Sequence, residues 1–138
     1  VGWNRQFHTH DGYGLKVLMR AGLKVGIISG GSSLGVKKRF EALGVNYIYL
    51  GNEDKREALN KIVADAGVEL EEVLYMGDEF FDLPVIKKVG FSATVPNASI
   101  EIRNSVDYIT HRTSGNACAR EVIDLVRHSQ GIIPQVEF

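Results

Sequence analysis

The stretch Lys24-Val-Gly-Ile-Ile-Ser-Gly-Gly-Ser-Ser33 decides the fold class. Its short apolar run is rich in β-branched residues and bounded by glycines, which is typical of a strand buried on both faces of a parallel sheet. The serines that follow can cap a helix from Leu34 to Leu43, and Gly44 can end it. A second apolar run at Val45–Leu50 repeats the strand pattern. A strand, a helix and another buried strand in succession predict parallel α/β architecture.

The same alternation extends along the chain in both directions. It predicts an α/β fold built as a doubly wound parallel sheet, with residues 1–138 forming one domain without repeats or linkers. Strands are expected at Trp3–Thr9, Lys24–Ser29, Val45–Leu50, Glu72–Met76, Phe91–Val95 and Tyr108–Thr110, and helices at Gly12–Arg20, Leu34–Leu43, Lys55–Ala66, Phe80–Val89, Ile100–Ser105 and Asn116–Gln130.

Composition narrows the class of protein further. The 138 residues are 44% apolar and 24% charged with a net charge of −1, which excludes disorder over most of the chain and gives no indication of a nucleic-acid or membrane partner. Cys118 is the only cysteine, so no disulfide can form within the chain, and a reducing, cytoplasmic setting is expected.

Two features at strand ends could bind an anion. Ser29 and Gly30 follow the first buried strand, where a hydroxyl and exposed backbone N–H groups at a helix N-terminus can hold a phosphate; an ordinary serine-capped turn is the alternative. Lys55 begins a helix, at the end where the dipole is positive and disfavours a cation. Either an anion lies nearby, or Lys55 is a solvated surface lysine.

Three carboxylates follow the strand that ends at Met76. Asp78, Glu79 and Asp82 carry the oxygens that Mg²⁺ prefers, and Asp82 lies one helical turn after Asp78. Capping of the next helix is the alternative, but one cap does not need three acids. Because the carboxyl ends of parallel strands meet at one edge, the anion site, the lysine and the metal site suit phosphoryl transfer.

These segments together resemble a known family. Ser29, Lys55 and Gly77-Asp78…Asp82 resemble motifs II, III and IV of the haloacid dehalogenase superfamily phosphatases. The match is nearest to the capless subfamily of 3-deoxy-D-manno-octulosonate 8-phosphate phosphatases, also through Asp11–Gly14, Gly51–Lys55, Gly77–Pro84 and Ala119-Arg120-Glu121, and it covers essentially the whole chain.

The resemblance implies a role for each matching residue. Ser29 would hydrogen-bond the transferring phosphoryl group with Gly30 beside it, Lys55 would neutralise its charge, and Asp78 would ligate Mg²⁺. Glu79 and Asp82 would support the metal from the second shell. The implied reaction is hydrolysis of a sugar-acid phosphate through an aspartyl-phosphate, in a capless Rossmann-like fold, as part of lipopolysaccharide biosynthesis.

The resemblance also implies a segment that does not occur among these 138 residues. The family's nucleophile lies in an Asp-x-Asp motif on a first strand ahead of a β-hairpin, and no such pair precedes Asp11. We therefore expect this strand to be missing from the given sequence; an inactive copy is the alternative. Gly31 stands where the family usually has arginine, and Thr113–Asn116 stands where it usually has two glycines. Both departures leave the particular sugar open.

The family forms homotetramers around projecting hairpins. Trp3–Thr9 would be one hairpin arm, and Trp3 and Phe7 share one face of it, so a neighbouring subunit is expected to bury them. The apolar tail Ile132–Phe138 could reach an adjacent subunit or lie on its own domain. Two other functions stay open: hydrolysis of a sialic-acid-type nine-carbon 9-phosphate, and a non-catalytic tetramerisation domain of a sialate cytidylyltransferase.

Other polar residues favour ordinary roles. His8 and His10 alternate on the hairpin strand and could bind a metal, but exposed positions are the commoner outcome, and His111 and His128 lie far from them in the sequence. Cys118 is interpreted as a small core residue rather than a nucleophile. Arg120 could reach the substrate or pair with Asp124 one helical turn on.

Overall fold

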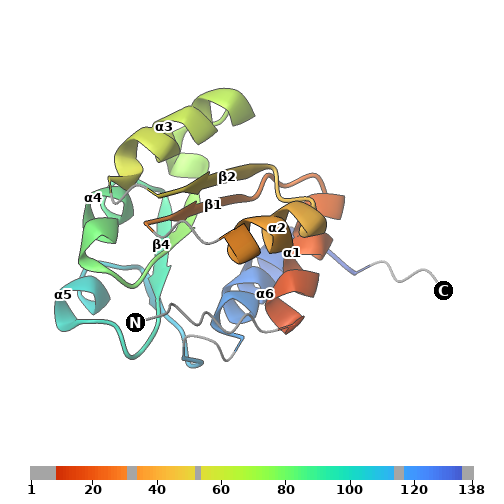
Figure 1. Cartoon of the computed structure of the whole chain (residues 1–138). Coiled ribbons are helices and arrows are strands. Elements are labelled where there is room, and N and C mark those ends of the chain that lie inside the picture. The colour runs from red at the N-terminus through yellow and green to blue at the C-terminus, as the bar shows by residue number, and fades with distance from the viewer. Residues whose placement is uncertain (1–8, 31–33, 52–53, 114–116, 135–138) are drawn as a thin grey trace.

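The computed structural model describes residues 9–30, 34–51, 54–113 and 117–134, and these form an α/β fold of parallel strands with helices between them (Figure 1). The α/β prediction is therefore confirmed. The strands are β1 (Gly26–Ser29), β2 (Tyr47–Leu50), β3 (Leu74–Met76), β4 (Phe91–Thr94) and β5 (Tyr108–Ile109). The helices are α1 (Thr9–Arg20), α2 (Leu34–Leu43), α3 (Lys55–Ala66), α4 (Leu83–Ile86), α5 (Ile100–Arg103) and α6 (Cys118–Gln130), with 3₁₀ turns η1 (Leu70–Glu72) and η2 (Phe80–Asp82).

The described strands form two sheets instead of the single sheet that the sequence predicts. β1 pairs in parallel with β2, and β4 pairs in parallel with both β3 and β5. Every pairing is parallel, as the buried apolar runs predict. The carboxyl ends of β1 and β2 lie at one edge of the first sheet, and those of β3, β4 and β5 at one edge of the second.

Helices cover the strands on both sides. α3 contacts β1 and α4, while α2 contacts β2 and α1, and in Figure 1 α3 lies on the opposite side of β1 and β2 from α2. α1 also packs closely against α6. A Cβ at Gly14 of α1 would lie 2.8 Å from the Arg120 Cδ atom, so a glycine at this position permits the close approach of the two helices.

Each sheet has its own apolar cluster. Beside β1 and β2, Val25, Phe40 and Val45 are buried together. Beside β3 and β4, a second cluster is formed by Ile86, Val95, Ala98 and Ile102, with Tyr75 and Met76 of β3 packed against it. The second cluster holds β3 in place, and β3 leads into the loop with the three acids, Gly77–Asp82, called the acidic loop below. Within the described ranges, no helix has both the length and the hydropathy to cross a lipid bilayer.

The start of the chain differs from the expectation where it is described. The predicted strand Trp3–Thr9 lies outside the described residues except for Thr9, which begins α1 three residues before the predicted helix start at Gly12. The hairpin arm and the predicted burial of Trp3 and Phe7 therefore remain predictions.

Three predicted helices are shorter in the structure, and α5 ends at Arg103 where the prediction extended to Ser105. The helix expected over Phe80–Val89 is a 3₁₀ turn followed by the four-residue α4, with Pro84 in its first turn as predicted. α6 begins at Cys118 and not at Asn116, because Ala117 has φ 64° and ψ 31°, the left-handed conformation. That conformation is unfavourable for a residue with a Cβ, and it sets the direction in which α6 starts.

Candidate active site

The predicted site residues lie at the carboxyl ends of β1 and β3 and at the helix start that follows β2. Ser29 is the last residue of β1 and is buried, and its carbonyl accepts a hydrogen bond of 3.0 Å from the Gly51 backbone N–H. Gly31, Ser32 and Ser33 lie outside the described residues. The anion-binding role of Ser29 and Gly30 therefore stays a prediction.

Lys55 is buried although it begins a helix. It is 8% exposed, and its Nζ atom lies 2.6 Å from Oδ1 of Asp82, 27 residues away in the sequence. The Phe81 ring centroid is 4.9 Å from the same Nζ, within the range of a cation–π contact. The surface-lysine alternative is wrong. The position of Lys55 at a helix N-terminus predicted a nearby anion. In this structure the carboxylate of Asp82 is that anion.

Asp82 accepts four hydrogen bonds. Its Oδ1 accepts from Lys55 Nζ and, at 2.5 Å, from the Tyr75 hydroxyl, while its Oδ2 accepts from the backbone N–H groups of Asp78 at 3.1 Å and Glu79 at 3.0 Å. A carboxylate has about four lone-pair sites, so these donors saturate it. Asp82 is 1% exposed. Its carboxylate therefore connects the start of α3, β3 and the acidic loop through hydrogen bonds.

Two of the three acids, Glu79 and Asp82, cap the helical turn that follows β3, as the capping alternative predicted. Glu79 is the N-cap of η2, and its side chain and that of Asp82 cap each other's backbone N–H groups. Asp78 takes no part in this capping box. Its side chain is exposed at the end of β3.

Gly77 makes room for the Asp82 carboxylate. A Cβ placed on Gly77 would lie 2.5 Å from Asp82 Cγ and 2.6 Å from Asp82 Oδ2. Asp82 is fully buried and cannot turn away into solvent. A glycine is therefore required by the close approach of a side chain and not by the backbone dihedral.

Replacing Gly77 by alanine is expected to lower kcat/KM by on the order of 100-fold and to destabilise the fold by about 2–3 kcal/mol. The added methyl group displaces Asp82, and Lys55 then loses its partner. Steady-state kinetics and urea unfolding measure the two effects. Gly26→Ala is the matched control, because its Cβ meets the movable end of Ile62 at 3.1 Å. Equal kinetics in the two variants would contradict this role for Gly77.

Tyr75 is a site residue that the sequence reasoning did not identify. It belongs to β3, and its hydroxyl donates to Asp82. Burial, the charge of Asp82 and their hydrogen bond raise the pKa of Tyr75 far above its usual value, so the hydroxyl remains a donor at every physiological pH. The only signal in the sequence was a hydroxyl on the strand predicted at Glu72–Met76.

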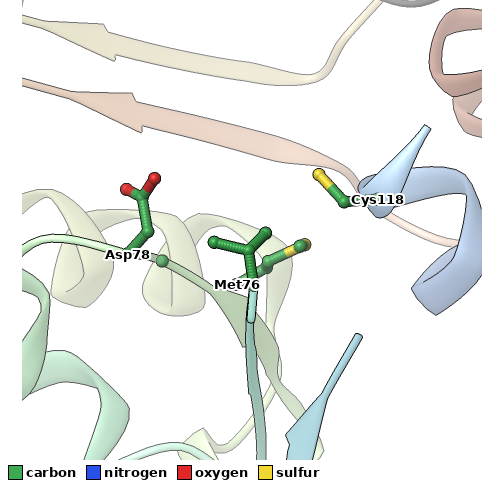
Figure 2. A pocket seen from close by; sticks show the side chains of 5 residues that line it. Met76, Asp78 and Cys118 are labelled. Atoms are coloured by element: carbon green, nitrogen blue, oxygen red, sulfur yellow. The ribbon is translucent and has the colours of Figure 1, made fainter. Parts of the chain in front are cut away.

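A cavity of about 180 Å³ opens beside Asp78 and is lined by Met76, Gly77, Asp78, Val95 and Cys118. Figure 2 shows Asp78 and Cys118 at opposite sides of it, with Met76 between them. Cys118 also packs against the apolar cluster beside β3, as expected for a small core residue. The cavity therefore has a polar side at Asp78 and an apolar side at Met76, Val95 and Cys118.

Residues of α6 hold the loop after β5. Glu121 accepts from the Tyr108 hydroxyl at 2.6 Å and from the backbone N–H groups of His111 and Arg112 at 2.9 and 3.0 Å. Burial alone would raise the pKa of Glu121, but these hydrogen bonds outweigh it and lower the pKa. Arg120 pairs with Asp124 at 3.1 Å, so of the two alternatives for Arg120 the ion pair is present.

The histidines do not gather into a metal site in the described part of the chain. His111 and His128 are exposed, His10 lies in α1, and His8 is outside the described residues. The described ranges hold no group of three or more His, Cys, Asp or Glu residues suited to a metal ion. The tail is described as far as Pro134, with Ile133 80% exposed, and its remaining residues lie outside.

Comparison with known proteins gives a consistent picture. Residues 48–122 match the family model described as haloacid dehalogenase-like hydrolase. The 3-deoxy-D-manno-octulosonate 8-phosphate phosphatase KdsC of Haemophilus influenzae is 35% identical over 127 residues, which are 92% of this chain and 71% of that protein. The region that the family model matches includes the predicted site residues Lys55, Asp78, Glu79 and Asp82. Ser29 and Gly30 lie before it.

Solved structures show the same similarity. The Moraxella catarrhalis 3-deoxy-D-manno-octulosonate 8-phosphate phosphatase, in complex with magnesium, phosphate and KDO, superposes with a TM-score of 0.87 at 38% identity, covering 91% of this chain and 72% of that chain. The cobalt-bound Haemophilus influenzae phosphatase gives a TM-score of 0.88 at 35% identity, covering 91% and 74%.

Proposed function

Because this chain belongs to the haloacid dehalogenase-like hydrolases and, within them, to the KdsC-type 3-deoxy-D-manno-octulosonate 8-phosphate phosphatase family, we propose that it hydrolyses 3-deoxy-D-manno-octulosonate 8-phosphate. The chain is a phosphatase, a phosphoric monoester hydrolase, by the same membership. The substrate proposal is supported by similarity over more than nine-tenths of the chain to a phosphatase that holds KDO and phosphate.

The buried Lys55–Asp82 pair beside the exposed Asp78 is the observation that supports the chemistry. Phosphoryl transfer spreads negative charge over the phosphoryl oxygens, and a fixed cation stabilises that charge without reorganising. Lys55 has two further N–H donors beyond the one given to Asp82. We assign Lys55 to the phosphoryl oxygens, and Ser29, next to Gly30, to one hydrogen bond with them.

Asp78 fits a divalent cation. Its carboxylate is exposed beside the cavity, whereas the Asp82 carboxylate is already saturated by four donors. Relatives bind magnesium or cobalt. We propose that Asp78 holds Mg²⁺ directly, that Asp82 and Glu79 shape the loop around it, and that the ion supplies charge neutralisation at the phosphate.

The proposed reaction needs a nucleophilic carboxylate. In it, a carboxylate oxygen bonds to phosphorus while the bond from phosphorus to the ester oxygen breaks, and that oxygen takes a proton from the second aspartate of the motif that the resemblance implies. The same aspartate then takes a proton from water, which attacks phosphorus and releases phosphate and the free carboxylate. The family resemblance implies that the nucleophile is the first aspartate of an Asp-x-Asp motif on a strand ahead of the hairpin. We propose that such a strand of the natural protein supplies it, which N-terminal sequencing tests.

Substrate choice is tested by phosphate release from the full-length protein. With Mg²⁺ present, kcat/KM for 3-deoxy-D-manno-octulosonate 8-phosphate is expected to exceed that for a sialic-acid-type 9-phosphate by about tenfold or more. The reverse order would move the assignment to the nine-carbon sugar. No release from either substrate would remove the proposal for both.

We place the reaction in the cytoplasm, since the chain has a single cysteine and its proposed substrate is a phosphorylated metabolite.

We further propose a homotetramer in which Trp3 and Phe7 are buried between chains. The resemblance implies that Trp3–Thr9 is a projecting hairpin arm, and the two aromatic side chains on one face of such an arm would need a partner surface. Sedimentation of the full-length protein at micromolar concentration is expected to give four times the monomer mass, and Trp3→Ser/Phe7→Ser is expected to lower it. A wild-type monomer would contradict this assembly.

A further inference from the structure

We infer that Tyr75 is a positioning residue: its hydroxyl fixes the Asp82 carboxylate and, through it, the charge that Lys55 presents to the phosphoryl group. The inference rests on the proposed role of Lys55, but not on the identity of the sugar. Tyr75 belongs to none of the segments that carry the family resemblance.

Two donors converge on one oxygen of Asp82. The Tyr75 hydroxyl lies 2.5 Å from Oδ1 and Lys55 Nζ lies 2.6 Å from the same atom. The other oxygen, Oδ2, is held by two backbone N–H groups of the acidic loop. The orientation of the carboxylate is thus set on both sides, from β3 by Tyr75 and from the loop by the backbone.

The hydroxyl changes how strongly Asp82 holds Lys55. A hydrogen bond to a charged acceptor draws charge from it, so the Tyr75 hydroxyl takes up part of the negative charge on Oδ1. Without the hydroxyl, Lys55 is the one remaining donor to that oxygen among the described contacts. The lysine is then drawn more strongly to Asp82, and it stabilises the phosphoryl charge less.

The Tyr75 ring is held independently of its hydroxyl. It packs against the apolar cluster of Ile86, Val95, Ala98 and Ile102, so removal of one oxygen leaves the ring in place. The raised pKa of Tyr75 keeps the proton on the hydroxyl, and the residue therefore donates rather than accepts. A purely structural role would lower stability alone, whereas a positioning role lowers turnover.

The test uses the full-length phosphatase with Mg²⁺ and p-nitrophenyl phosphate, a monoester without the sugar. Tyr75→Phe is expected to lower kcat about tenfold while KM changes less than about threefold, because the lost interaction acts on charge in the transition state. Tyr108→Phe is the matched control: it also removes a hydroxyl that donates to a carboxylate, that of Glu121 at 2.6 Å. Its kcat is expected to stay at the wild-type value.

A second series keeps the hydroxyl in case the phenylalanine variant does not fold. Incorporation of 3-fluorotyrosine and 3,5-difluorotyrosine at position 75 makes the hydroxyl a progressively stronger donor, and kcat is expected to rise with it. Unchanged kcat in both Tyr75→Phe and the fluorinated series, or an equal loss in Tyr108→Phe, would overturn the inference. In a Lys55→Met background, where the cation is absent, Tyr75→Phe is expected to lower kcat less than threefold, and a full tenfold loss there would also overturn the inference.

Failure of the proposed function gives a different result. If Lys55→Met keeps wild-type kcat, the role of Lys55 falls, whatever Tyr75 does. If the full-length protein prefers another sugar phosphate, the substrate proposal falls and the Tyr75 result is unaffected. If Lys55→Met loses activity while Tyr75→Phe keeps it, only the inference about Tyr75 is wrong.

Discussion

Replacing Lys55 by methionine is expected to lower kcat on the order of 10³-fold, since it removes the fixed cation that faces the transferring phosphoryl group. The same change leaves the Asp82 carboxylate buried and without its counter-charge. Breaking a buried ion pair from one side typically costs about 3–5 kcal/mol of stability. Initial rates of phosphate release and urea unfolding measure the two losses.

A double variant separates catalysis from folding. Lys55→Met/Asp82→Asn replaces the buried pair by neutral groups of similar size, and the asparagine carbonyl can still accept from Tyr75 or the loop backbone. Its stability is expected to return to within about 1–2 kcal/mol of wild type, while its turnover stays as low as that of Lys55→Met. Recovery of turnover together with stability would show that Lys55 acts only in folding.

Replacing Asp78 by asparagine is expected to abolish Mg²⁺-dependent hydrolysis, with kcat/KM lowered at least about 10³-fold. The amide lacks the negative charge that a divalent cation requires of its ligands. Because the Asp78 side chain is exposed, the free energy of unfolding should change by less than about 1 kcal/mol. Rates measured over a Mg²⁺ titration, with thermal unfolding alongside, give both quantities.

Asp65→Asn is the control for this change. Asp65 is an exposed acid in α3, outside the acidic loop, so its replacement removes the same charge from another part of the surface. It should keep wild-type activity and the wild-type Mg²⁺ dependence. Hydrolysis by Asp78→Asn at the wild-type rate, with the same response to Mg²⁺, would remove Asp78 from the metal site.

The strands and most helices could be predicted because their signals are local. The apolar runs of β1 and β2 are bounded by glycines, and Gly67 ends α3 in the left-handed conformation that such a position favours. The break between η2 and α4 was not predicted. There the capping box of Glu79 and Asp82 closes a tight 3₁₀ turn before α4 can begin.

The sequence indicated Lys55, Asp78 and Asp82 as candidate site residues, but it predicted neither their contacts nor the contribution of Tyr75. The position of Lys55 against the helix dipole indicated a nearby anion, yet the pairing with Asp82 spans 27 residues and depends on how α3 packs beside the acidic loop. The same is true of Gly77, whose need for a missing Cβ arises from Asp82 folding back over it. Contacts of this kind are set by packing, and no periodicity in the sequence encodes them.

Titration calorimetry with inorganic phosphate tests most directly whether the Lys55–Asp82 pair builds the phosphoryl site. The full-length wild-type protein and the Lys55→Met/Asp82→Asn variant are compared in the presence of Mg²⁺, after thermal unfolding has shown that both are folded. The wild type is expected to bind phosphate and the double variant to bind it at least about tenfold more weakly, in line with one lost charge-assisted contact. Equal affinity in two folded proteins would contradict the account.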